Sequence, residues 1–179
     1  DAIWQSKARG AADMPEPARK PVRETAARPK VSPKQAAHLP RFVEPQLCRL
    51  VDTPPSGAGW LHEVKFDGYR MQLRVEGGKA RLLTRKGLDW TDKFAAIARA
   101  AAKLPDSIID GEICALDHNG APDFASLQAA LSDSQSDSLI FFAFDLMFLD
   151  KQDLRALPLT ERKARLEALL KTAGTLRYV

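Results

Sequence analysis

An alternation of apolar and polar side chains in the middle of the chain is the feature that most constrains its fold. Residues 63–70 alternate with the period of a β-strand, and residues 71–76 continue the same pattern. Gly77-Gly78 is a two-residue hairpin signal, and residues 80–83 form the returning strand. The sequence therefore predicts a sheet that is built around a strand over 63–70 and a hairpin that follows it.

The rest of the chain mixes further strands with helices. Residues 39–59 indicate an ordered lead-in whose apolar side chains can dock on a core, namely Phe42, Leu47, Leu50 and Val51. A helix over 94–104 is predicted from its apolar spacing, with Thr91 or Asp92 as its cap and Pro105 as its end. The other predicted elements are strands over 107–116 and 139–149, a short helix capped by Asp123, a helix over 160–171 and the start of a strand at 175–179.

The first 38 residues have a different composition. They carry prolines among alanine, lysine and arginine with little periodicity: Pro15, Pro17, Pro21, Pro29 and Pro33. Such a segment buries too little apolar surface to fold, so we expect a basic, disordered linker over 1–38 and a folded part over 39–179. The chain does not start with methionine, which suggests a fragment of a longer protein.

Charge and cysteine content narrow the functional classes. The 179 residues carry a net charge of +4 and a pI of about 9.2, which fits either simple solubility or an anionic partner such as nucleic acid or nucleotide phosphate. Cys48 and Cys114 lie far apart without metal-site spacing, which favours a reducing cytoplasm over a disulfide or zinc framework. The apolar run over 139–149 contains Asp145 and is too short for a membrane span, and no signal peptide is visible.

Lys65 is the candidate nucleophile. It stands between Glu63 and Asp67 in the predicted strand, and a lysine amine attacks only after burial or cationic neighbours favour its neutral form. Arg70, Arg85 and Lys86 are candidates for such neighbours if the hairpin folds them toward the site. The alternative is a solvent-facing lysine on an edge strand.

Three further positions leave two interpretations open. Arg85 and Lys86 form either a solvated hairpin end or a clamp for phosphate and ribose. Asp110 and Glu112 share one face of an apolar strand, where they either bind Mg²⁺ or are neutralised by arginines. Phe144 fits the core, or alternatively stacks on a base.

Together these residues resemble the nucleotidyltransferase superfamily of ATP-dependent DNA ligases and mRNA capping enzymes. Four segments match its motifs in order: Lys65-Phe66-Asp67-Gly68 with Arg70, Thr84-Arg85-Lys86-Gly87, Asp110-Gly111-Glu112 and Phe144-Asp145-Leu146. Flanking segments such as Leu88-Asp89-Trp90-Thr91 are similar to the ligase domain of multifunctional bacterial non-homologous end-joining enzymes. The resemblance covers about residues 39–179.

The resemblance implies a fold and a set of roles. The fold is the α+β adenylation domain of the ATP-grasp-like DNA ligase fold, with antiparallel sheets flanked by helices, in truncated form. Lys65 would attack the α-phosphate of ATP, and Asp67 would keep it placed. The binding residues implied are Glu63 at the adenine edge, Phe144 stacked on adenine, Arg70 and Arg85 at ribose and phosphate, and Glu112 at ribose or Mg²⁺ (or Mn²⁺).

The resemblance also implies partners and a limit. The substrate would be a nicked or broken DNA duplex, repaired by end joining in a bacterial cytoplasm at the nucleoid, with a Ku-type end-binding protein as partner and no membrane. Two later motifs and an OB domain of the family are absent from this sequence, so we expect no ligation by this chain alone. An RNA ligase, an mRNA capping guanylyltransferase and a non-catalytic DNA-binding fragment stay open as alternatives.

Overall fold

The structure is a computed structural model that describes residues 32–133, 135–171 and 174–179. Its elements in chain order are β1 (Lys34–Gln35), β2 (Tyr69–Glu76), β3 (Lys79–Thr84), the 3₁₀ helix η1 (Thr91–Phe94), α1 (Ala95–Ala101), β4 (Ser107–Cys114), α2 (Phe124–Ser132), the 3₁₀ helix η2 (Ser136–Ser138), β5 (Ile140–Leu149), β6 (Gln152–Asp153), α3 (Leu159–Leu170) and β7 (Leu176–Tyr178). None of the helices described is both long and apolar enough to span a bilayer.

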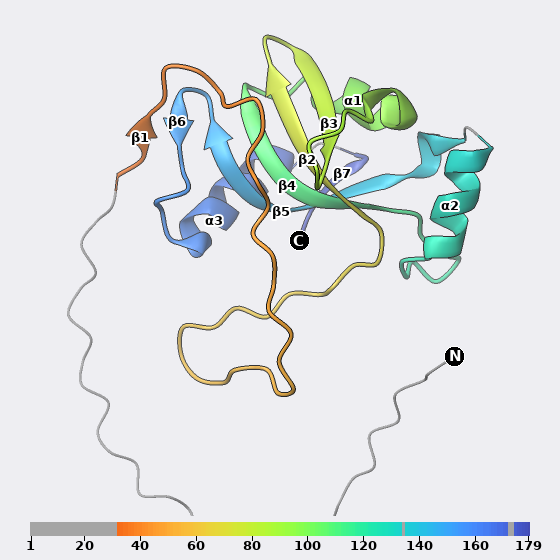
Figure 1. Ribbon diagram of the computed structural model, residues 1–179, viewed down its shortest axis with the longest axis horizontal. Coiled ribbons are helices and arrows are strands. Elements are labelled where there is room, and N and C mark those ends of the chain that lie inside the picture. Colours follow the sequence, from red (N-terminus) through yellow and green to blue (C-terminus); the bar gives the residue numbers. More distant parts are fainter. Residues whose placement is uncertain (1–31, 134, 172–173) are drawn as a thin grey trace, which may run out of the picture. The chain divides into compact units, whose positions relative to one another are not determined.

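The strands of the described residues form one sheet (Figure 1). Its order is β1-β6-β5-β4-β2-β3, and every pair along this path is antiparallel. β7 lies parallel to the first part of β5, because α3 returns the chain to the same end of the sheet. The predicted α+β class with an antiparallel sheet and flanking helices is confirmed.

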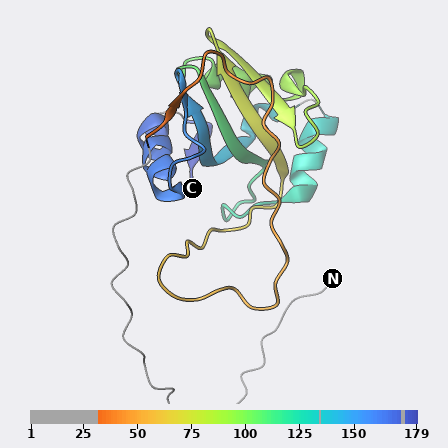
Figure 2. The ribbon, with the colours of Figure 1, turned by 60° about the vertical axis from the view of Figure 1, so that its left-hand side comes forward.

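One face of the sheet carries the main core. Alternate residues of β2 point there, since Met71, Leu73 and Val75 are fully buried with Ile97 of α1 and Leu166 of α3. Leu127 of α2 joins the same cluster, so all three helices contribute to it. The helices therefore fix the position of the sheet from this side, and none of the three covers its opposite face (Figure 2).

The opposite face holds two small apolar clusters with acids between them. Ile108, Met147 and Phe148 form one cluster, which the segment around Ala36, Leu39 and Val43 covers. Cys114, Ile140 and Phe142 form the other, and Phe66 stacks on Phe142 with 4.3 Å between ring centroids. Asp110 and Glu112 lie on β4 between Ile108 and Cys114, so each of these acids is flanked by packed apolar side chains.

The prediction of a strand over 63–70 is wrong for most of that range. β2 begins at Tyr69, and residues 60–67 form an exposed loop that leaves the sheet, coloured yellow in Figure 1. The reason lies in the partner strand, because Tyr69 pairs with Ile113 and β4 ends one residue later at Cys114. Without a neighbouring ladder, the alternation of Val64 and Phe66 does not suffice to make a strand.

The predicted docking of the lead-in is confirmed only in part. Phe42 and Val43 are partly buried, but Leu47, Leu50 and Val51 are 67%, 96% and 55% exposed. Beyond Gln46 the chain leaves the sheet and runs on into the exposed loop of residues 60–67. These three side chains therefore do not pack against the core.

The expected linker over 1–38 also needs a correction at its end. Lys34–Gln35 form β1, which pairs with β6, and the Ala36 amide donates to the Lys151 carbonyl at 2.9 Å. Ala36 and Leu39 close the cluster around Ile108, which explains why the chain is ordered before residue 39. The rest of the predicted linker, residues 1–31, lies outside the described residues.

Two capping predictions had different outcomes. Asp123 caps α2, accepting from the amides of Ala125 at 3.0 Å and Ser126 at 3.2 Å, as predicted. Neither Thr91 nor Asp92 caps a helix with its side chain. The Thr91 hydroxyl instead accepts the Leu82 amide at 3.0 Å, so it ties η1 to β3.

Candidate active site

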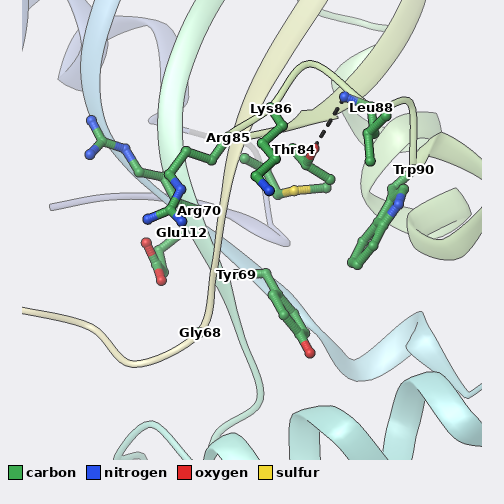
Figure 3. A pocket seen from close by; sticks show the side chains of 10 residues that line it. Gly68, Tyr69, Arg70, Thr84, Arg85, Lys86, Leu88, Trp90 and Glu112 are labelled. Atoms are coloured by element: carbon green, nitrogen blue, oxygen red, sulfur yellow. Dashed lines mark hydrogen bonds between the residues drawn. The ribbon is translucent and has the colours of Figure 1, made fainter. Parts of the chain in front are cut away.

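A hollow of about 440 Å³ opens beside the start of β2 and brings several of the predicted site residues together (Figure 3). We call it the first hollow. Arg70, Arg85 and Glu112 line it, although they come from β2, the turn after β3, and β4. Lys86 and Trp90 extend the lining. With Tyr69, the first hollow thus combines three cations, one carboxylate and two aromatic rings.

Arg70 is held in place by Asp110. Its Nε and Nη2 donate to the two carboxylate oxygens at 3.1 and 2.7 Å, and its Nη1 donates to the Gln46 carbonyl at 2.9 Å. These hydrogen bonds to Asp110 raise the pKa of Arg70 above its ordinary value. The structure therefore resolves one open question, because Asp110 is the acid that an arginine neutralises.

Glu112 lies directly opposite Arg70 across the β2–β4 pair. Burial is the main cause that raises the pKa of its carboxyl group, against opposing contributions from the Gly68 amide and from Arg70 and Lys65. No salt bridge engages Glu112 within the described residues, in contrast to Asp110. Glu112 is thus the acid of this strand that is open to a ligand.

The two glycines of the motifs in this region are required by close packing. A Cβ on Gly111 would lie 2.4 Å from the Phe141 ring, and one on Gly68 would lie 2.1 Å from the Ile113 carbonyl oxygen. Any larger residue would therefore push β5 or the start of β2 away from β4. Gly68 thus lets the strands that carry Arg70 and Glu112 approach each other closely, and Gly111 does the same for β4 and β5.

A tight turn presents Arg85 and Lys86. The Gly87 amide donates to the Thr84 carbonyl at 2.8 Å, and the Leu88 amide donates to the Thr84 hydroxyl at 3.1 Å. Gly87 has a φ of +75°, a conformation that favours glycine. This turn leaves both Arg85 and Lys86 exposed at the edge of the first hollow.

A second hollow, of about 490 Å³, lies on the other side of Arg70. It brings together Glu63, Arg70 and Phe144, with Asp110 and Asp145 also in its lining. The Arg70 guanidinium lies 5.4 Å from the centre of the Phe144 ring, which is only partly buried. Because one face of this ring takes part in the second hollow, Phe144 is more than a core residue.

Lys163 of α3 is a residue that the sequence did not single out. Its ammonium pairs with the Glu63 carboxylate and donates to the carbonyls of Phe144 at 3.4 Å and Val179 at 2.7 Å. Its side chain is only 12% exposed. Lys163 thus joins the exposed loop to β5 at the position of Phe144.

Lys65 lies outside both hollows. Its side chain is 89% exposed, and its amine is 4.0 Å from an oxygen of Asp67. The described residues therefore leave the amine in contact with solvent, and the burial that a nucleophilic lysine requires is not found here. The loop that carries Lys65 leaves the sheet at Gly68, so its neighbours in sequence are not its neighbours in a packed site.

No group of three or more histidine, cysteine or acidic residues converges on a metal site in the ranges that the structure describes. Glu112 remains as one carboxylate. This donor set fits Mg²⁺, because Mg²⁺ keeps several waters and binds through one or two carboxylates together with substrate phosphates.

Comparison with known proteins decides the family. The family model for the ATP dependent DNA ligase domain matches residues 45–178. The chain belongs to this family. The match contains all four motifs that surround the two hollows, from Lys65 to Leu146.

Individual members show the same relationship. Over 134 residues the chain is 44% identical to the multifunctional non-homologous end joining protein LigD of Pseudomonas aeruginosa, covering 74% of this chain and 16% of that protein. It is 33% identical over 130 residues to the SPbeta prophage-derived DNA ligase-like protein LigB of Bacillus subtilis, covering 72% and 47%. The chain thus spans less than half the length of these relatives.

Solved structures agree with the family. The ligase domain of LigD from Mycobacterium tuberculosis matches with a TM-score of 0.56 and 32% identity, over 64% of this chain and 37% of that chain. A mycobacterial DNA ligase D complexed with ATP and MES matches with a TM-score of 0.57 and 30% identity, over 65% and 38%. The ligase fold predicted from the sequence is therefore confirmed.

Proposed function

We propose that this chain is the N-terminal portion of the adenylation domain of an ATP-dependent DNA ligase that acts in bacterial end joining, in the cytoplasm at the nucleoid. The observation that carries the proposal is the first hollow, where Arg70, Arg85 and Glu112 converge from three separate motifs. Family membership supplies the class of reaction. The proposed substrates are ATP and a nicked or broken DNA duplex, and a Ku-type end-binding protein is the proposed partner.

The proposed reaction begins at Lys65. Its deprotonated amine attacks the α-phosphorus of ATP, a P–N bond forms, and the bond to pyrophosphate breaks. The AMP group then passes to the 5′-phosphate of DNA, with a new P–O bond and release of the lysine. Attack by the 3′-hydroxyl on that 5′-phosphate seals the strand and releases AMP.

The other site residues bind and position the nucleotide. Phe144 offers a ring face for adenine, and Glu63 a carboxylate for its edge. Arg70 and Arg85 bring fixed positive charge to ribose and phosphate, and such charge stabilises the transition state of phosphoryl-type transfer. Bound Mg²⁺ (or Mn²⁺) would neutralise phosphate charge, with Glu112 as the carboxylate that holds it or contacts ribose.

Lys65 reaches such a nucleotide only if its loop closes over the face of the sheet. Asp67 contacts the Lys65 amine and fits a role in orienting it. Glu63, two residues before Lys65, is already held by Lys163. Lys163 therefore anchors the loop beside the second hollow, close to where the proposed adenine would lie.

Labelling with nucleotide tests the proposal. We expect α-labelled ATP and Mg²⁺ to label Lys65, located by peptide mapping, whereas Lys65→Ala and Lys65→Arg take no label. Label from GTP alone would favour an mRNA capping guanylyltransferase. DNA binding without label, unchanged by Lys65→Ala, would favour a non-catalytic DNA-binding fragment. Failure to seal nicks by this chain alone stays a prediction, which ligated product would contradict.

A further inference from the structure

A third hollow, of about 410 Å³, lies on the outer face of the β2–β3 hairpin. We call it the basic hollow. Four cations line it, Arg41, Arg74, Lys79 and Arg81, together with the two acids Glu76 and Asp89. These residues come from the lead-in, from both strands of the hairpin and from the segment after the turn. None of the four cations belongs to the proposed nucleotide site.

The two acids cancel only part of the charge of the four cations. Glu76 pairs with Arg74 at 2.9 Å, and Arg74 also donates to the Pro40 carbonyl at 3.0 Å. Asp89 accepts from the Thr91 amide at 3.0 Å and also from the Thr91 hydroxyl. Within the described ranges, no salt bridge or side-chain hydrogen bond engages the exposed cations Arg41, Lys79 and Arg81.

One pair of charges in the hairpin acts against local stability, although Glu76 is the direct cross-strand partner of Lys79 and also pairs with Arg74. Arg74 and Arg81 are direct cross-strand partners in the β2–β3 ladder. Like charges at directly opposite positions destabilise a sheet, and solubility alone requires only scattered surface charge. Rules of local stability are most often broken at functional sites, so the pair of arginines points to an anionic partner.

The basic hollow is continuous with the candidate active site. Leu88 lines both the basic hollow and the first hollow, and the exposed Arg85 and Lys86 stand on the turn between them. The six residues of β3 extend over about 20 Å, since a strand rises about 3.4 Å per residue. One DNA strand carries a phosphate every 3.4 Å or so along the helix axis, so this distance matches about six phosphates.

We propose that Arg41, Lys79 and Arg81 form a track for the phosphate backbone of duplex DNA, which leads over the Thr84–Leu88 turn to the candidate active site. The inference rests on the proposed function for its choice of DNA. The track is open and its charges are spread over the lead-in and β3, which suits an extended polyanion better than a free nucleotide. It positions the duplex and reads no base.

Neutralising the track tests the inference. In the full chain, Arg41→Gln/Lys79→Gln/Arg81→Gln should weaken binding to a nicked, 5′-phosphorylated DNA duplex, measured by fluorescence anisotropy over a salt series. The slope of log K against log salt should fall by about 2 to 3, since each phosphate contact contributes about 0.9. Duplexes of unrelated sequence should be affected equally.

The matched control removes the same charge from the helical face. Arg99→Gln/Lys103→Gln/Lys171→Gln changes three exposed cations next to α1 and α3 and should keep the wild-type slope. An equal loss of DNA affinity in both triple variants would show that only the net charge matters, which would overturn the inference. Unchanged DNA affinity in the track variant would overturn it as well. A loss seen with an RNA duplex but not with DNA would contradict the choice of partner.

Two further measurements separate possible failures. Both triple variants should take the same amount of label from ATP as the wild type. If the wild type takes no label but the two triple variants still differ in slope, the proposed function fails and the DNA track stands. If the triple variant does not fold, Lys79→Gln at the exposed hairpin end should lower the slope by about 1. An unchanged slope there would refute the track.

Discussion

At the scale of single residues, the two acids of β4 have different roles although they are two positions apart. Asp110 is 6% exposed and is paired with Arg70 through both of its oxygens. Glu112 has no such partner among the described residues, and burial raises its pKa. The first acid fixes the arginine, and the second is left for a ligand.

Glu112 makes the stability of the protein depend on pH. Below its ordinary pKa the carboxyl is neutral in both the folded and unfolded states and contributes nothing. As the pH rises from its ordinary pKa towards its raised folded pKa, the carboxyl ionises first in the unfolded state, so stability is lost, and the loss is complete above the folded pKa. Glu112→Gln should therefore melt at a higher temperature than wild type at pH 7, because glutamine carries no charge into the partly buried site.

The advantage of Glu112→Gln should vanish below about pH 4, where the wild-type carboxyl is neutral as well. Glu167→Gln, which removes an exposed acid from α3, is the control and should show no such trend. Melting curves by circular dichroism across this pH range measure both variants. A lower melting temperature for Glu112→Gln at pH 7 would mean that ionised Glu112 stabilises the fold.

At the scale of elements, β4 depends on a glycine that faces the helix-covered core. Gly111→Ala places a Cβ 2.4 Å from the Phe141 ring and 2.6 Å from the Phe142 carbonyl oxygen. Overpacking of this kind costs about 1 to 3 kcal/mol or more, so the urea midpoint should fall markedly. Gly120→Ala is the control, because open space surrounds Gly120 and only its φ of +80° opposes the change, at a cost of about 1 kcal/mol. Equal losses in the two variants would show that Phe141 does not need the glycine.

Most elements could be predicted from the sequence because their signals are local. The hairpin around Gly77-Gly78, the strand Ser107–Cys114 and the Asp123 cap depend on residues close together in the chain. The exposed loop could not be predicted, because Val64 and Phe66 alternate as in a strand and only the end of β4 shows that they have no partner. Which elements exist was therefore easier to predict than where they end.

The candidate site was predicted only in part for the same reason. Its motifs identify Arg70, Arg85 and Glu112, and the structure brings these three together. The sequence left open which acid of β4 binds an arginine, since that choice depends on side-chain geometry. It gave no signal for Lys163, whose contact with Glu63 joins residues 100 positions apart. Trp90 had a signal in the flanking segment Leu88-Asp89-Trp90-Thr91 but no assigned role.

At the scale of the whole molecule, β1 ties residues before the predicted boundary at 39 to the sheet. A chain that starts at Ser32 should melt within about 1 °C of the full chain if residues 1–31 are the predicted linker. A chain that starts at Leu39 loses the β1–β6 hydrogen bonds and the Ala36 contact, and should lose about 1 to 2 kcal/mol of stability. Calorimetry on the two shortened chains measures this difference. Equal melting temperatures would restore the boundary at residue 39.

β5 has strand partners on both sides, with β4 along its length and β7 and then β6 on the other edge. Its amide hydrogens should therefore exchange with deuterium only when the whole sheet opens, whereas those of the exposed loop around Lys65 should exchange within seconds. Ala143, which is paired with both β4 and β7, belongs to the slow class and Lys65 to the fast one, whereas the β4–β5 register passes over Phe144. The proposed nucleophile thus lies on backbone that opens quickly, next to strands that open slowly, and the time that its loop spends closed over the sheet sets how often Lys65 meets the nucleotide.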